Sequence, residues 1–193
     1  MLTDIKTALR PALALTLAFA LLLGVAYPLA LTGIGQGLFP AQANGSLITE
    51  QGKVIGSSLI GQGFASPRYF HGRPSAAGKG YDASASSGSN LGPAAQALSD
   101  RVTADVAATR TSPGSLVPPD LVTTSASGLD PHISPEAAFY QVARVAQARG
   151  LDPAKVRALA QERVEYPLFG FLGEPRVNVL ELNRALDRTH AGA

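Results

Sequence analysis

A long apolar segment near the amino terminus dominates the hydrophobic pattern of the chain. No Asp, Glu, Lys or Arg occurs between Pro11 and Thr49, and residues 12–31 consist almost entirely of Ala, Leu, Val and Phe. An α-helix rises about 1.5 Å per residue, so about 20 apolar residues cross a bilayer core of about 30 Å. Every later segment is interrupted by charge, Gly or Pro well before that length. The pattern therefore predicts one transmembrane helix, at residues 11–32.

The charges that flank this helix predict its orientation. Lys6 and Arg10 precede the helix, whereas no Lys or Arg follows it until Lys53. Positively charged flanks stay in the cytoplasm, so we expect the amino terminus there and the bulk of the chain on the opposite side. The predicted divisions are a cytoplasmic tail at residues 1–10, the transmembrane helix at 11–32, a membrane-exit linker at 33–44 and a single extracytoplasmic α+β domain at 45–190.

A cleavable signal peptide is the alternative to a retained anchor. The sequence Ala41-Gln42-Ala43 has the A-x-A form that cleavage favours. The apolar run is longer than the roughly 7 to 15 residues of a signal-peptide core, however, and residues 33–40 separate its end from the candidate cleavage site. These lengths favour a retained single-pass anchor. In either case most of the chain is exported.

The remaining sequence has the patterns of a mixed α and β domain with more helix than sheet. Two runs rich in Val, Ile and Leu around Gln51-Gly52 predict a β-hairpin. Ser134-Pro135 and Asp152-Pro153 are helix-start signals, and Gly150 ends the first of these two helices. The other predicted features are hairpin strands at 46–50 and 53–60, a helix from Pro93 to about Arg110, a strand at 121–124, and a last helix capped by Asn178 and running to Asp187. Core positions are predicted at Ala143 on the helix after Ser134 and at Val164 on the helix after Asp152.

Composition narrows the possible chemistry. The 193 residues include no Cys and only three His, and the formal net charge is +2 with both signs interspersed. An exported domain without Cys has neither disulfides nor thiolate metal sites, and without a basic cluster nucleic-acid binding has no support. Residues 72–79 resemble a phosphate-binding loop only superficially. Five residues rather than four separate the two glycines, and Gly80 stands where that loop needs Ser or Thr.

Three loops carry polar and aromatic side chains at a density unusual for linkers. In the first, at residues 67–74, Arg68 and Arg73 flank an aromatic pair. Either these arginines bond carbonyl groups of neighbouring loops, or the loop forms a contact surface, where Arg and Tyr are favoured. The same two interpretations apply to the loops at 86–93 and 123–135. The candidate partner-contact residues are Arg68, Tyr69, His71, Arg73, Ser89, Asn90, Asp130 and His132.

The third loop also contains the residue types of a hydrolytic triad, namely Ser125, Ser127, Asp130 and His132. Members of a triad usually come from separate elements, and the chain has no Gly-x-Ser-x-Gly elbow. A serine hydrolase is therefore only a minor alternative. We expect His132 to hydrogen-bond a backbone carbonyl and to fix its loop.

Four longer motifs follow one another along the chain. They are Tyr69-Phe70-His71-Gly72-Arg73-Pro74-Ser75, Gly88-Ser89-Asn90-Leu91-Gly92-Pro93, Ser127-Gly128-Leu129-Asp130-Pro131-His132-Ile133-Ser134-Pro135, and Gly173-Glu174-Pro175-Arg176-Val177-Asn178-Val179-Leu180 with Leu182-Asn183. This series resembles the C subunit of the bacterial potassium-transporting P-type ATPase, the Kdp system. The resemblance covers nearly the whole chain, including the apolar segment. One departure is Ser87, where the family usually has Gly.

The resemblance implies an accessory subunit of a four-subunit complex in the bacterial inner membrane. In that family a channel-like subunit takes up potassium, a P-type subunit hydrolyses ATP, and a very small subunit stabilises the assembly. The C subunit has no active site of its own and binds no cofactor firmly, since the complex handles ATP and potassium. Its role is described as that of a catalytic chaperone that raises the ATP affinity of the hydrolysing subunit, and as that of an assembly factor and periplasmic cover beside the potassium entrance.

Gln141 is the position at which a nucleotide effect should be tested, although an exposed helical glutamine is the favoured interpretation of this residue. Direct contact with cytoplasmic ATP conflicts with the predicted orientation, because only residues 1–10 lie on that side. Two alternatives fall outside the family. One is a free membrane-anchored periplasmic protein that binds a small ligand or a glycan, and the other is a periplasmic serine hydrolase.

Overall fold

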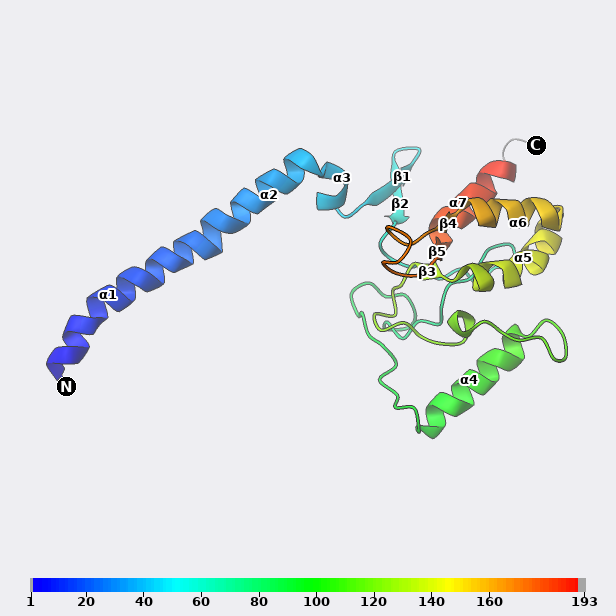
Figure 1. Cartoon of the computed structure of the whole chain (residues 1–193), viewed down its shortest axis with the longest axis horizontal. Coiled ribbons are helices and arrows are strands. Elements are labelled where there is room, and N and C mark those ends of the chain that lie inside the picture. Colours follow the sequence, from blue (N-terminus) through cyan, green and yellow to red (C-terminus); the bar gives the residue numbers. More distant parts are fainter. Residues whose placement is uncertain (1, 191–193) are drawn as a thin grey trace. The chain divides into compact units, whose positions relative to one another are not determined.

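The computed structural model describes residues 2–190 and divides the chain into two compact units, one ending at Leu47 and one beginning at Ile48 (Figure 1). The first unit is helical. Its helices α1 (Leu2–Leu21), η1 (Leu22–Ala26) and α2 (Tyr27–Leu38) follow one another without a break. Between Asp4 and Leu38 this helix is long and apolar enough to cross a membrane, and none of it is buried. The helix extends beyond both ends of the predicted transmembrane segment at residues 11–32. Which of its residues lie in lipid stays a prediction.

The segment η1 is a π-helical turn that ends at Ala26, two residues before Pro28. Proline has no backbone N–H, and its ring crowds the carbonyl four residues earlier, so the carbonyl of Gly24 cannot be paired in the usual way. The N–H of Tyr27 bonds the carbonyl of Leu22, five residues before it, instead of one four residues before it. This wider turn lets the helix continue through the proline instead of ending there.

The end of the apolar helix folds back on itself. Phe39 departs from helical geometry, and α3 (Pro40–Ala43) follows it. The side-chain amide of Asn44 donates to Gln36 Oε1 at 3.0 Å, and the amide of Gln36 donates to Asn44 Oδ1 at 3.2 Å. Residues 33–44, which the sequence suggested as an exit linker, are therefore largely helical and tied together by this amide pair.

The second unit contains two small sheets and four α-helices among the described residues. Its elements are β1 (Leu47–Glu50), β2 (Lys53–Ser57), α4 (Gln96–Thr109), the 3₁₀ turn η2 (Pro119–Leu121), β3 (His132–Ile133), α5 (Pro135–Arg149), α6 (Pro153–Glu162), β4 (Val164–Glu165), β5 (Arg176–Asn178) and α7 (Val179–His190). Strands β1 and β2 form the predicted hairpin, and β3, β5 and β4 form an antiparallel sheet in that order. The α+β class with more helix than sheet is confirmed.

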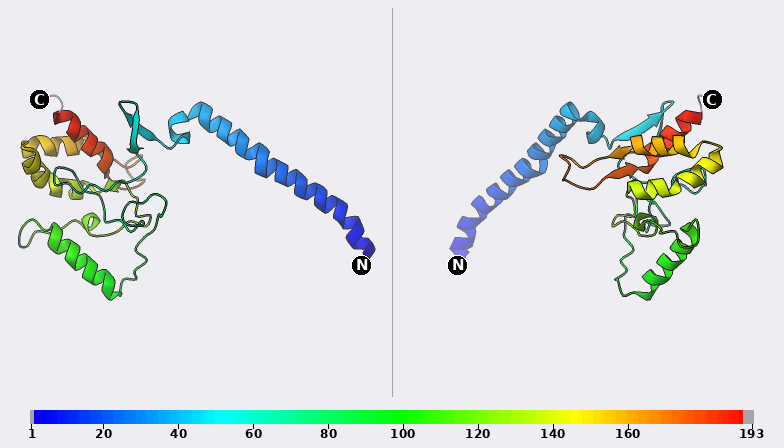
Figure 2. Two further views of the ribbon diagram at one scale, coloured as in Figure 1. Left: turned by 180° about the vertical axis from the view of Figure 1, so that it is seen from behind. Right: turned by 45° about the vertical axis from the view of Figure 1, so that its right-hand side comes forward.

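The core lies where α5, α6 and α7 pack together against the three-stranded sheet (Figures 1 and 2). Val177 occupies the centre of β5, where it pairs with Ile133 of β3 on one side and with Val164 of β4 on the other. The largest apolar side chains that are buried almost completely are Phe70, Val145, Val156, Val177, Leu182 and Leu186. Helix α4 lies apart from this core and has no buried residue.

The predicted helix caps are confirmed. Ser134 Oγ accepts a hydrogen bond from the N–H of Ala137, and Gly150 ends α5 with a φ of 67°. Asp152 Oδ1 accepts from the N–H of Ala154, and Asn178 Oδ1 accepts from the N–H of Glu181. These short polar side chains satisfy N–H groups that the first turn of a helix leaves without partners.

Other predicted elements are wrong in detail. Residues 121–124 form no strand, because Pro118 and Pro119 lead into the 3₁₀ turn η2. Val164 packs against the core as predicted but belongs to β4 rather than to a helix, and Ala143 is exposed. The boundaries differ as well: β2 ends at Ser57, α4 begins at Gln96 and α7 continues to His190.

Candidate functional site

Two side-chain amides hold the extended backbone at Phe70 and His71 between α5 and α7. Asn183 of α7 accepts from the N–H of Phe70 at 2.8 Å and donates to its carbonyl at 2.9 Å. Gln141 of α5 accepts from the N–H of His71 at 2.8 Å and donates to its carbonyl at 3.0 Å. Successive residues of an extended chain direct their N–H and C=O groups to opposite sides. The two amides therefore act as substitute neighbouring strands, one on each side, and we call this arrangement the amide clamp.

The amide clamp gives Gln141 a structural role. Its side chain is 4% exposed, so its interpretation as an exposed glutamine is wrong. Besides pairing with His71, its amide donates to the carbonyl of Ala137, and its oxygen accepts from Arg144 Nη2 at 2.6 Å. Both polar atoms of Gln141 are thus engaged within the domain. A nucleotide effect at this position stays a prediction.

Arg149 fixes the start of the same loop. Its side chain is almost fully buried, donates to the carbonyl of Arg68 at 2.7 Å and forms an ion pair with Asp187 at 2.8 Å. The guanidinium also lies over the ring of Tyr69, 4.8 Å from the ring centre, and the Tyr69 hydroxyl donates to Asp187. The candidate residue Arg68 contributes its carbonyl to this arrangement, while its side chain is exposed.

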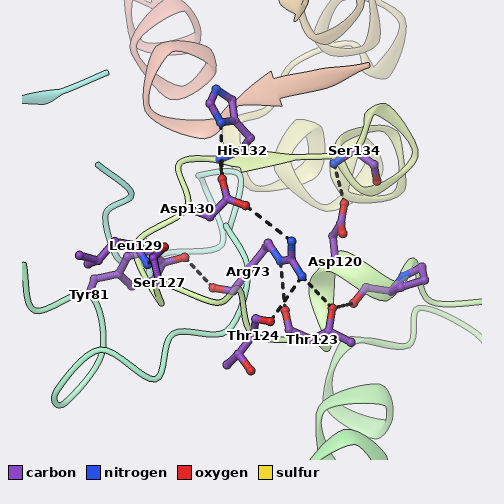
Figure 3. A network of polar contacts seen from close by, with 11 residues as sticks. Arg73, Tyr81, Asp120, Thr123, Thr124, Ser127, Leu129, Asp130, His132 and Ser134 are labelled. Carbon is purple, nitrogen blue, oxygen red and sulfur yellow. Dashed lines mark hydrogen bonds and ion pairs between the residues drawn. The ribbon is translucent and has the colours of Figure 1, made fainter. Parts of the chain in front are cut away.

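Arg73 connects the first loop to the third (Figure 3). Its Nε donates to the carbonyl of Thr123 at 3.2 Å, and its Nη2 reaches the Thr123 hydroxyl and the carbonyl of Thr124. Its Nη1 lies 3.6 Å from Asp130 Oδ2. The hydroxyl of Tyr81 donates to the carbonyl of Arg73 at 2.6 Å. Arg73 therefore makes the bonds within the domain that one of the two interpretations predicts.

Asp130 joins this network to His132. The carboxylate accepts from the backbone N–H of His132 at 3.0 Å and lies 3.4 Å from the imidazole Nδ1. The bond with the His132 side chain lowers the pKa of Asp130 most, and the His132 backbone N–H and the charges of His132 and Arg73 add to this effect despite partial burial. The imidazole of His132 contacts a carboxylate and not the predicted backbone carbonyl. A shallow depression of about 360 Å³ opens beside Arg73, Asp130 and His132.

The serine-rich loops interlock through close backbone contacts. The N–H of Ser87 donates to the carbonyl of Ser127 at 3.0 Å. Gly128 has a φ of 66°, and a Cβ at this position would lie 2.6 Å from the Ser87 carbonyl oxygen. Only glycine allows the backbones of the two loops to come this close together. The candidate residues Ser89 and Asn90 follow directly, with Asn90 exposed at a φ of 53°.

The hydrolase alternative finds no support in this geometry. Ser125 is buried, the Ser127 hydroxyl accepts from the N–H of Leu129, and the His132 imidazole lies against Asp130. Within residues 2–190 the structure shows no hydrogen bond between a serine hydroxyl and His132. The residues of this loop therefore fix the loop and do not form an activated nucleophile.

The candidate residues thus form three groups rather than one site. Arg73, Asp130 and His132 meet in one network, Tyr69 and His71 belong to the segment that the amide clamp holds, and Ser89 and Asn90 lie in the interlocked loops. Sequence reasoning missed the roles of Asn183, Arg149 and Tyr81. The signal for Asn183 was its place between Leu182 and Leu186 on the apolar face of a helix.

Loss of the amide clamp should destabilise the domain. Gln141→Leu leaves the N–H and the carbonyl of His71 without partners, so we expect a loss of about 2 to 4 kcal/mol in the free energy of unfolding. Gln147→Leu, on the exposed face of the same helix, should cost less than about 0.5 kcal/mol. Urea unfolding of the full chain in detergent, followed by circular dichroism, measures both. Equal effects of the two substitutions would contradict the clamp.

The imidazole of His71 should make stability dependent on pH. Its Nε2 lies 3.0 Å from the carbonyl of Ser66, and burial lowers its pKa, with the charge of Arg144 adding to this effect. The unfolded chain therefore binds the proton more readily than the folded chain. The stabilising contribution is complete above the ordinary histidine pKa of about 6.5 and is lost as the pH falls through the lower folded pKa.

An NMR titration of the full chain in micelles measures this pKa directly, with His71→Gln to assign the resonance. We expect a midpoint below the ordinary histidine value. The loss of stability on acidification should also become shallower in the variant. A midpoint at or above the ordinary value would show that the imidazole is not desolvated.

Comparisons with known proteins agree with one another. The chain matches the family described as K+-transporting ATPase, c chain, over residues 9–188. A relative from Caulobacter vibrioides is 62% identical over 181 residues, covering 93% of this chain and 92% of that protein. A relative from Polaromonas naphthalenivorans is 61% identical over 186 residues (94% and 95%), and one from Bradyrhizobium diazoefficiens is 55% identical over 196 residues (95% and 98%). Each of the three is named as a potassium-transporting ATPase KdpC subunit. The chain therefore belongs to the KdpC family, the c chain of the K+-transporting ATPase.

Proposed function

We propose that this chain is the accessory, non-hydrolysing subunit of an ATP-driven potassium uptake complex in the bacterial inner membrane. The family supports this assignment, because the relatives carry the name of a subunit of the potassium-transporting ATPase. The observation that carries it beyond the name is the helix between Asp4 and Leu38, which has no charged residue after Arg10 and none of which is buried. Lipid and the membrane helices of partner subunits are the surroundings that such a helix requires.

The proposed partners are the channel-like potassium-translocating subunit, the P-type ATP-hydrolysing subunit and the small stabilising subunit of the same complex. In this proposal they handle potassium and ATP, and the present chain contributes assembly and support. The loops around Arg73, Ser89 and Asp130 are held in place by bonds within the domain. Such fixed loops suit a partner surface, because their conformational entropy is already lost before binding.

The proposed orientation places the second unit in the periplasm. Lys6 and Arg10 before the helix, and no Lys or Arg after it until Lys53, support this side. An influence on the ATP affinity of the hydrolysing subunit then passes through the membrane helix or through partner subunits. This route separates the proposed nucleotide effect from any direct contact between ATP and Gln141.

Purification in mild detergent tests the proposed assembly. With an affinity tag on the full chain and the other subunits present, two large membrane subunits and potassium-stimulated ATPase activity should co-elute. As a control, residues 4–38 are replaced by an unrelated transmembrane helix of equal length. This variant keeps the membrane attachment and should lose the partners, because its helix surface no longer matches them. A wild-type chain that elutes alone and monodisperse would contradict the proposal.

A further inference from the structure

The loop between β4 and β5 exposes a cluster of large apolar side chains. It projects away from the sheet in Figure 2 and is drawn in orange-brown in Figure 1. Between Glu165 and Glu174 the sequence contains no charged residue. The exposed side chains of this loop, which we call the apolar hairpin, are Tyr166 (70% exposed), Leu168 (64%), Phe169 (78%), Phe171 (74%) and Leu172 (53%). Apolar surface gathered in this way marks an interaction site.

The apolar hairpin has a defined shape. Leu168 and Leu172 form an antiparallel bridge, and the N–H of Leu172 donates to the carbonyl of Leu168 at 3.0 Å. Phe169 and Gly170 both have positive φ angles, 56° and 79°. The rings of Phe169 and Phe171 stack with their centres 6.4 Å apart. The bulky Phe169 adopts a backbone conformation that aromatic residues rarely take, and it does so while presenting its ring to the outside.

A lipid bilayer lies within reach of this hairpin. Only residues 44–47 separate α3 from the second unit, and when fully extended they span at most about 14 Å. A domain of this length has a radius of gyration of about 15 Å. The anchor therefore keeps every surface of the domain within the extended linker plus about one domain diameter of the end of α3.

The charges at the base of the hairpin indicate what kind of lipid surface it fits. Arg176 and Glu165 pair at 2.9 Å, and Arg163, Glu162 and Glu174, which flank the hairpin in sequence, are all exposed. With both signs present, the base offers no net attraction to anionic headgroups. The apolar tip and the amphipathic Tyr166 instead match the interfacial layer of a zwitterionic bilayer, where Tyr is enriched and Phe and Leu side chains can be buried.

We propose that the apolar hairpin at residues 166–172 inserts into the interfacial layer of the same bilayer that the apolar helix crosses. The domain then has two attachments, its covalent link at residues 44–47 and this hairpin. Two attachments restrict how the domain can turn over the membrane. The proposal rests on the membrane anchor and does not depend on assembly with other subunits, so each of the two can fail without the other.

The chain contains no Trp, so a single introduced Trp reports on the hairpin alone. We would place Phe169→Trp in the full chain, without partner subunits, in nanodiscs of zwitterionic lipid. We expect the fluorescence emission of this Trp to be blue-shifted relative to Trp in water. We also expect it to be quenched by lipids that carry bromine in their acyl chains. The matched control is Leu116→Trp, at a loop position that is 91% exposed, which should show water-like emission and no such quenching.

A second substitution tests whether the apolar surface causes the insertion. Adding Phe171→Asp to the Phe169→Trp chain should restore water-like emission and abolish quenching, because a carboxylate at the tip opposes entry into the bilayer. Added salt should change nothing, since no charge attraction is involved. The proposal is overturned if Phe169→Trp behaves like the Leu116→Trp control. It is equally overturned if the Trp is shielded only when partner subunits are present and bromine-labelled lipid still does not quench it.

Discussion

The amide clamp around Phe70 and His71 is the interaction on which the shape of the domain depends. Residues 58–95 form neither helix nor strand, although Phe70 and Ala77 within them are completely buried. Buried backbone N–H and C=O groups need partners, and here side chains of α5 and α7 supply them. The two amides bond both edges of one extended segment, Phe70 and His71. The backbone of the loop that follows therefore starts from a fixed position.

The arrangement of the candidate contact residues follows from that clamp. Downstream of His71, Arg73 bonds the carbonyls of Thr123 and Thr124, and Ser75 bonds the carbonyl of Gly128. Each contact ties the first loop to the third with a polar side chain instead of a strand ladder. A domain with only short strands therefore keeps a defined loop surface. In the KdpC family this is the surface that we propose to face the partner subunits.

The sequence predicted those parts of the fold that depend on local chemistry. The helix caps at Ser134, Asp152 and Asn178 and the long apolar helix were predictable, because each depends on neighbouring residues or on uninterrupted hydrophobicity. The contacts of Gln141 and Asn183 were not, since their partners lie 70 and 113 positions away. Val164 was misplaced for the same reason: its strand exists only because Val177 pairs with it. The sequence motifs indicated the family. They did not predict that several of their residues form hydrogen bonds and ion pairs with one another.

The side of the membrane on which the second unit lies decides whether it can ever meet ATP, and the proposed role as a periplasmic accessory subunit depends on it. The chain contains no Cys, so single cysteines at the exposed positions Lys6 and Lys79 can be labelled in cells with a maleimide that does not cross the inner membrane. We predict that Lys79→Cys is labelled in intact cells and that Lys6→Cys is labelled only after the inner membrane is broken. Labelling of Lys6→Cys in intact cells, with Lys79→Cys protected until lysis, would contradict the account.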